Sequence, residues 1–145
     1  MQSLFSRAAV AGLLMGVSLF AAAEGMPTSE APAGAKVYIV SPKDGDTVDK
    51  TFTVKFGIEG MKLAPAGDAT PNTGHHHLLV DVTEQPPAGV PLPVTDHILH
   101  FGKAQTETQL TLAPGKHTLQ LLLGDKYHVP FKPTVESEKI TVTVK

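Results

Sequence analysis

The stretch TFTVKFGI at residues 51–58 alternates apolar and polar side chains at every second position. Phe52, Val54 and Phe56 fall on one side of this run, and threonine and lysine fall on the other. Because successive side chains of a β-strand point to opposite faces, this period of two predicts a strand with one buried face. A helix would repeat its apolar positions every three to four residues instead. The stretch therefore favours a β fold.

Six further runs with strand character accompany this one. They are rich in Val, Ile, Thr and Leu, and glycine- or proline-containing turn signals separate most of them. The Ala-Pro-Gly segment at 113–115 predicts a tight turn that joins the strands on either side into a hairpin. The runs are KVYIV (36–40), HHHLLVDV (75–82), HILHF (97–101), TETQLTL (106–112), HTLQLLL (117–123) and EKITVTV (138–144).

Long loops occupy residues 59–74 and 84–95. The second contains four prolines, which exclude a helix or an interior strand there. About seven short strands without a convincing amphipathic helix predict an all-β fold. The expected architecture is an antiparallel two-sheet sandwich of immunoglobulin- or fibronectin-like type, with a closed barrel as the alternative.

The first 23 residues have the pattern of a cleavable Sec-type signal peptide. Arg7 supplies a positive charge, residues 8–20 are apolar but too few to span a bilayer comfortably, and residues 21–23 are alanines. We therefore expect residues 1–23 to be removed and the protein to be periplasmic or secreted. An uncleaved membrane anchor is the alternative interpretation.

The remainder divides into a short linker and one domain. Residues 24–35 are rich in Pro, Ala, Gly and Ser, a composition that predicts a flexible linker. Residues 36–145 then form a single β-sandwich domain, because a chain of this length supports one hydrophobic core.

Charge and cysteine content exclude several classes of function. The formal net charge is −2, and the only arginine, Arg7, lies in the expected signal peptide. We therefore expect no nucleic-acid partner and no membrane insertion after signal cleavage. The chain has no cysteine, which excludes thiol nucleophiles, zinc ribbons and cysteine-ligated copper centres. A metal site would use histidine, carboxylate, methionine or backbone oxygen.

All seven histidines lie between residues 75 and 128, and three of them are consecutive. In a strand, His75 and His77 share one face and lie roughly 6.5 Å apart along the chain. Two imidazoles at this spacing can converge on one metal ion at about 2.0–2.1 Å. We expect this pair to face outward near loops. His76 falls on the core side and is a reserve ligand.

Further histidines follow the proline-rich loop and lie near the C-terminus. His97 and His100 would face opposite sides of a regular strand, so joint ligation requires a bend there. His128 lies on a loop close to Asp125 and is a ligand or a surface residue. His117 begins an inward leucine stripe, and we expect a hydrogen-bonded residue at the core edge. The candidate metal ligands are His75, His76, His77, His97, His100 and His128.

Three blocks of sequence resemble the bacterial family called domain of unknown function 4399. They are PNTGHHHLLVD (71–81), HILHFGKAQTETQLTLAPGKHTLQLLLGD (97–125) and HVPFKPTVESEKITVTV (128–144). The resemblance extends over about residues 36–145 and implies a small, exported, β-rich protein without an established activity. In this family the last block often reads His-x-Pro-His, whereas Phe131 replaces the second histidine here.

The leading hypothesis is a periplasmic histidine-rich binding module that coordinates copper or zinc as Cu(II) or Zn(II). Imidazole suits both ions, and intrinsic affinities favour copper at a nitrogen-rich site. The alternative is a structural or adhesion-type envelope module in which the histidines form a hydrogen-bonded loop network, with another envelope protein as partner. A metal-dependent hydrolase with three histidines and a water molecule is the third hypothesis. We assign no catalytic residue and expect a binding protein rather than an enzyme.

Overall fold

The computed structural model describes residues 25–145, so the expected signal peptide at 1–23 lies outside the described residues. The elements in this range are all strands, and no helix within it could span a bilayer. The strands are β1 (Lys36–Ser41), β2 (Thr47–Val48), β3 (Thr51–Glu59), β4 (Lys62–Leu63), β5 (Thr73–Val80), β6 (Ile98–His100), β7 (Glu107–Thr111), β8 (Gly115–Gly124) and β9 (Ile140–Val144).

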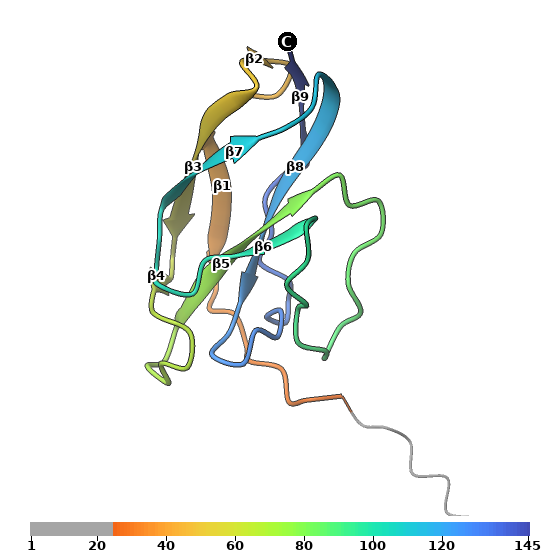
Figure 1. The fold of residues 1–145 in the computed structure, drawn as a ribbon. Helices are drawn as coiled ribbons and strands as arrows, with labels where there is room; N and C mark the ends of the chain where they lie inside the picture. Colours follow the sequence, from red (N-terminus) through yellow and green to blue (C-terminus); the bar gives the residue numbers. More distant parts are fainter. Residues whose placement is uncertain (1–24) are drawn as a thin grey trace, which may run out of the picture.

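These strands form two sheets that pack face to face (Figure 1). The smaller sheet has the order β1-β3-β7, and the larger has the order β2-β9-β8-β5-β4, with β6 paired to β5. All pairings are antiparallel except two short parallel ones, β2 with β9 and β4 with β5. The predicted all-β, fibronectin-like two-sheet sandwich is confirmed. The seven longer strands correspond to the seven expected runs, and β2 and β4 have only two residues each.

The main core lies between the two sheets. From the smaller sheet, Val54 and Phe56 on β3 are buried, as the alternation of TFTVKFGI predicts. From the larger sheet, Leu119, Leu121 and Leu123 on β8 have no exposed surface and join the same cluster. Each fully buried aliphatic side chain contributes about 1.5–3 kcal/mol through removal of apolar surface from water.

The prediction of a hairpin around residues 113–115 is wrong. Strand β7 pairs with β3, whereas β8 pairs with β5 and β9, so the Ala-Pro-Gly segment connects the two sheets. Leu110 on β7 and Leu119 on β8 are buried in the same core cluster, one from each sheet. Two strands joined by a short turn can pair within one sheet or belong to two sheets that pack face to face. Both arrangements have the same alternation of apolar and polar residues, so the local sequence does not distinguish them.

A second, smaller apolar cluster covers the outer face of the larger sheet. Leu79 on β5, Ile98 and Leu122 pack there against Leu92 from the proline-rich loop. Strand β5 is therefore buried on both faces: seven of its eight residues, from Gly74 onward, are buried. The proline-rich loop therefore buries the outer face of β5.

Residues 25–35, expected to be a flexible linker, are attached to the domain. The backbone N–H of Ala31 donates to the Lys132 carbonyl at 3.0 Å, and the Lys132 N–H donates to the Ser29 carbonyl at 2.9 Å. Met26 donates in the same way to the Gly89 carbonyl at 2.9 Å. Composition did not predict this docking because its partners are backbone groups of distant loops.

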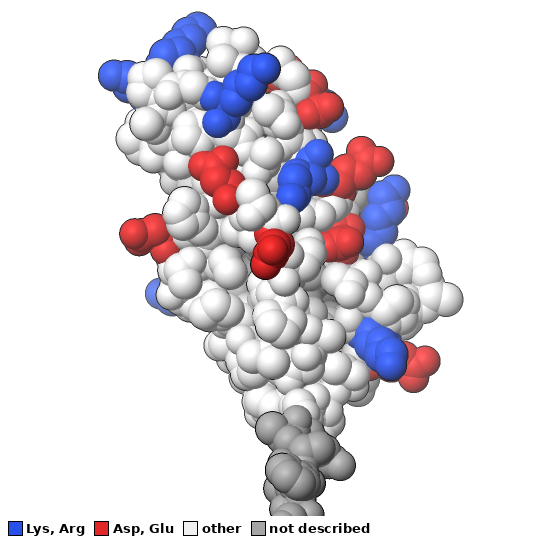
Figure 2. Space-filling model, turned by 90° about the vertical axis from the view of Figure 1, so that its right-hand side faces the viewer, with Lys and Arg blue, Asp and Glu red and all other residues white. Residues whose placement is uncertain are grey.

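The visible face of the molecule carries charges of both signs. Figure 2 shows lysine and acidic side chains next to one another, with fewer charges on the part closest to residue 25. No single-sign patch dominates this face.

Candidate metal centre

Four imidazoles from three segments of the larger sheet converge on one point. Strand β5 supplies His75 and His77, β6 supplies His100, and the loop after β8 supplies His128. One nitrogen from each ring can be chosen such that all four nitrogens lie within 4.8 Å of one another. The start of β5 and the end of β8 lie in the half of the sandwich nearer to residues 25–35 (Figure 1).

Strand register brings three of these side chains together. His77 on β5 is paired directly with His100 on β6, so their side chains share one face of the sheet. His75 is two residues earlier on the same face, opposite Gly124 on β8. The geometry follows from the period of two in β5 combined with the β5–β6 pairing.

Two glycines provide the space that the imidazoles occupy. A Cβ atom on Gly124 would lie 2.6 Å from Cε1 of His77, closer than carbon atoms can approach. A Cβ on Gly102 would collide with Cε1 of His100 in the same way. The sequence pattern singled out neither position. Glycine at the end of a leucine-rich strand was the available signal for close approach by another group.

Asp125 holds the loop that presents His128. Its Oδ1 accepts hydrogen bonds from the N–H groups of Tyr127, at 2.8 Å, and Val129, at 3.0 Å. Its Oδ2 accepts a hydrogen bond from the Ser29 hydroxyl at 2.7 Å. These bonds maintain a tight turn in which His128 has a φ of 67°, a conformation that is unusual outside glycine. Asp125 is 3% exposed, so a buried carboxylate lies next to the histidine cluster.

The rings are close enough to act as one unit. Their centroids are separated by 4.6 Å for His100 and His128 and by 5.9 Å for His77 and His128, with the other four pairs in between. The Nε2 atoms of His75 and His100 are 3.1 Å apart and share a hydrogen bond, one ring donating and the other accepting.

Most of the remaining buried ring nitrogens in the cluster have no hydrogen-bond partner among residues 25–145. They are Nδ1 of His75, both nitrogens of His77 and Nδ1 of His128. A buried polar atom without a partner costs about 1–3 kcal/mol, and native proteins contain few of them. Four such atoms in one cluster indicate that the imidazoles are arranged for a ligand rather than for one another.

Burial keeps the inner imidazoles uncharged at neutral pH. Burial and, after it, the neighbouring His128 and His100 lower the pKa of His75 to about 4, while Asp125 acts in the opposite direction. Burial also lowers the pKa of His77 to about 3, with the same histidine neighbours contributing. The pKa of His100 is lowered by burial and by His128. A neutral imidazole is the form that binds a metal ion.

The other candidate ligands lie outside the cluster. His76 faces the main core, where its ring packs against Phe56 at a centroid distance of 5.1 Å. His97 lies just before β6 and is exposed, and its Nδ1 donates a hydrogen bond to the Val80 carbonyl at 2.9 Å. The chain bends at Asp96 and His97, but this bend does not bring His97 into the cluster that contains His100.

The expectation that His75 and His77 face outward is also wrong. They point away from the main core, as the alternation predicts, but they are only 1% and 0% exposed. The proline-rich loop and the loop around His128 cover this face, joined by a hydrogen bond from the Leu92 N–H to the His128 carbonyl at 2.8 Å. His117, expected to be a hydrogen-bonded residue at the core edge, bonds to Asp81 and lies outside the cluster.

The dimensions of the cluster suit a four-coordinate ion. With metal–nitrogen bonds of about 2.0–2.1 Å, neighbouring ligand atoms lie about 3.3 Å apart in a tetrahedron, and opposite ones about 4.1 Å apart in a square. The widest separation here, 4.8 Å, is reduced to these values if each nitrogen moves inward by less than about 1 Å. The cluster can therefore hold a metal ion through four imidazole nitrogen ligands.

Comparisons with known proteins identify a family and two partly similar structures. The sequence profile of the family described as "Domain of unknown function (DUF4399)" matches residues 54–145. No curated protein sequence matches the chain. The X-ray structure of the endo-beta-1,4-mannanase from Thermotoga petrophila is 20% identical, with a TM-score of 0.45, over 77% of this chain and 20% of that chain. The Clostridium thermocellum CbhA fibronectin(III)-like modules are 12% identical, with a TM-score of 0.38, over 74% of this chain and 92% of that chain. This chain therefore spans about a fifth of the length of the mannanase.

Proposed function

The chain belongs to the DUF4399 family, and we propose that it is a periplasmic module that binds one divalent transition-metal ion, Cu(II) or Zn(II). The ligands are His75, His77, His100 and His128. The observation that carries this proposal is the convergence of four imidazoles, two buried and two half-buried, whose ring nitrogens largely lack partners within the described chain.

The donor set narrows the class of ion. Four imidazole nitrogens without thiolate or carboxylate suit Cu(II) and Zn(II), and the general order of affinities places copper first. Hard ions such as Ca²⁺ and Mg²⁺ prefer oxygen ligands and would bind poorly here. The nearby carboxylate of Asp125 supplies one negative charge in a buried environment, which offsets part of the charge that a divalent ion brings.

A closed binding site agrees better with this geometry than a catalytic one. Catalytic zinc sites use three protein ligands and leave one position for water, whereas four protein ligands complete a tetrahedral shell. A hydrogen-bonded loop network also accounts poorly for the cluster, because only His75 and His100 bond to each other through their rings. Binding, storage or delivery of the ion is thus favoured over hydrolysis.

The test uses two neighbouring histidines as a matched pair. Untagged protein is stripped with a chelator and titrated with Cu(II) and with Zn(II) by calorimetry. His100→Ala removes a proposed ligand that is only partly buried, and we expect it to weaken binding at least about a hundredfold, or roughly 2.7 kcal/mol. His97→Ala removes an exposed imidazole on the same strand segment but outside the cluster, and should leave the affinity unchanged.

Unfolding free energies of both metal-free variants show whether the fold is retained. One ion per chain, lost in His100→Ala and retained in His97→Ala, supports the proposal. Equal affinities in the wild type and His100→Ala would contradict it, as would a purified protein that binds neither ion tighter than a short histidine peptide. Elemental analysis of protein isolated from the periplasm identifies the ion and tests the expected location.

A further inference from the structure

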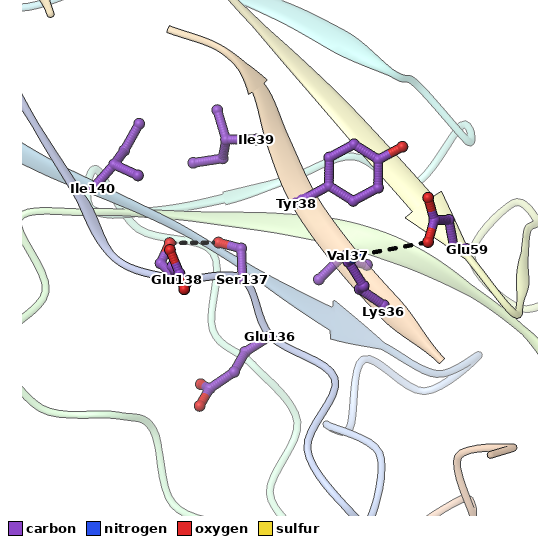
Figure 3. Close-up of a pocket in the computed structure, with 9 residues that line it drawn as sticks. All are labelled: Lys36, Val37, Tyr38, Ile39, Glu59, Glu136, Ser137, Glu138 and Ile140. Carbon is purple, nitrogen blue, oxygen red and sulfur yellow. Dashed lines mark hydrogen bonds and ion pairs between the residues drawn. The ribbon is translucent and has the colours of Figure 1, made fainter. Parts of the chain in front are cut away.

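A groove runs along the free edge of the smaller sheet and shares no residue with the histidine cluster. It has a volume of about 550 Å³ and lies between β1 and the segment that leads into β9. Val37 and Ile39 on β1 and Ile140 on β9 form its apolar floor (Figure 3). A groove of this size accommodates side chains of an added polypeptide strand.

The edge of β1 that borders this groove is open to hydrogen bonding. Strand β1 is the terminal strand of its sheet and pairs only with β3. An edge strand of this kind leaves about half of its backbone N–H and C=O groups directed away from its neighbour. The opposite wall of the groove is held in place by Ser137, whose N–H donates to the Leu121 carbonyl at 2.9 Å. The groove therefore lies beside unpaired backbone groups of β1.

The rim of the groove is acidic. Figure 3 shows the carboxylates of Glu136 and Glu138 on one side of β1 and that of Glu59 on the other. Lys36 is the one basic residue of the lining, and it forms an ion pair with Glu59 at 3.6 Å. Three carboxylates and one ammonium give the lining a net charge of −2. Such a rim attracts a partner that carries basic side chains.

We propose that this groove binds an extended segment of another protein in which apolar and basic side chains alternate, added as a strand to the free edge of β1. In an extended segment, alternate side chains point to opposite sides, so one set fills the apolar floor while the other reaches Glu136 and Glu138. A second copy of this chain fits less well, because its own groove would bring the same net negative charge to the contact.

The probe is a synthetic peptide about as long as β1, in which valine and lysine alternate. Binding to the chelator-treated protein is measured by fluorescence anisotropy, with backbone amide shifts recorded by NMR to locate the contact. We expect binding that weakens with salt, with shifts concentrated in β1 and residues 136–140. A peptide with glutamate in place of lysine should bind at least about tenfold more weakly.

Two controls separate strand addition from general attraction. The same lysine peptide with alternate N-methylated backbone amides cannot pair along an edge strand, and its binding should be lost. The variant E136Q/E138Q should bind about tenfold more weakly, whereas E84Q/E107Q, with the same change of charge at exposed sites outside the groove, should bind normally.

The proposal is overturned if the lysine and glutamate peptides bind equally or if N-methylation has no effect. It is equally overturned if E84Q/E107Q weakens binding as much as E136Q/E138Q, or if the only association at this face is between copies of the chain. Because every titration is performed without metal, failure here leaves the metal proposal standing, and failure of the metal proposal leaves this result unaffected.

Discussion

The histidine cluster and His117 differ in the direction in which their surroundings shift the imidazole pKa. At one end, His75, His77, His100 and His128 are packed against one another, and the pKa values of the first three are lowered mainly by burial. Elsewhere in the larger sheet, beside the connection between β7 and β8, His117 donates from Nδ1 to Asp81 and from Nε2 to the Ala113 carbonyl, both at 2.7 Å. Both partners of His117 are acceptors, so its ring carries two protons and a positive charge.

The difference follows from the neighbours of each ring. The Asp81 bond and then the Ala113 bond raise the pKa of His117 despite some burial. Within the cluster, no carboxylate among the described residues accepts a hydrogen bond from a ring, and the neighbours are other imidazoles. His117 thus stabilises the fold as a cation, whereas burial disfavours the charged forms of His75, His77 and His100 and leaves these rings able to bind a cation.

Acid should destabilise the metal-free protein strongly. The pKa values of His75 and His76 are lowered to about 4, and that of His77 to about 3, in each case mainly by burial. Their unfolded value is about 6.5, so between these limits the unfolded chain binds more protons than the folded one, and stability is lost as pH falls. At pH 5.5 each group costs about 1.4 kcal/mol, and together they cost on the order of 4 kcal/mol relative to pH 7.5.

Urea unfolding at the two pH values measures this loss. His76→Leu is the matched control, because it removes one of the three buried groups and none of the proposed ligands, and it should reduce the loss by about a third. A metal-free protein that is equally stable at pH 5.5 and 7.5 would show that the buried rings are not held neutral.

Gly124→Ala should disturb the cluster from the opposite strand. Gly124 has no positive φ, so alanine fits the backbone, but the new methyl group would meet the His77 ring at 2.6 Å. We expect a loss of about 1–3 kcal/mol in stability together with weaker metal binding. The double variant G124A/H77A should recover part of the stability, because the clash is gone. If the stability loss of the double variant equals the sum of the two single losses, Gly124 acts independently of His77.

Asp81→Asn should give the smallest effect and the opposite pH dependence. Because the pKa of His117 is raised in the folded state, the His117–Asp81 pair stabilises the protein fully below about pH 6.5, the pKa of the unfolded chain. This contribution is lost as the pH rises through the pKa of His117 in the folded protein. We expect the variant to lose about 1 kcal/mol near pH 6 and less near pH 9, since this is a partly exposed ion pair. Thermal unfolding at both values measures the change. Metal affinity should be unaltered. A weaker affinity would show that the Asp81–His117 pair and the histidine cluster are energetically coupled.

Much of this arrangement is contained in local sequence. The period of two in TFTVKFGI and in the strand that begins with the histidine triplet predicts which side chains share a face. It correctly separates His76, whose ring packs against Phe56 in the core, from His75 and His77, which belong to the cluster. Face assignment needs only the pleat of a strand, which every residue in it obeys.

Tertiary structure alone decided the rest. The β5–β6 register placed His100 beside His77, the turn around Asp125 added His128, and the proline-rich loop buried a face that alternation predicted to be exposed. Tertiary structure also decided that β7 and β8, which the Ala-Pro-Gly segment connects, belong to different sheets. These features depend on contacts between residues far apart in the chain. Their energies come from the packing of whole sheets and loops, which a local pattern of apolar and polar residues does not encode.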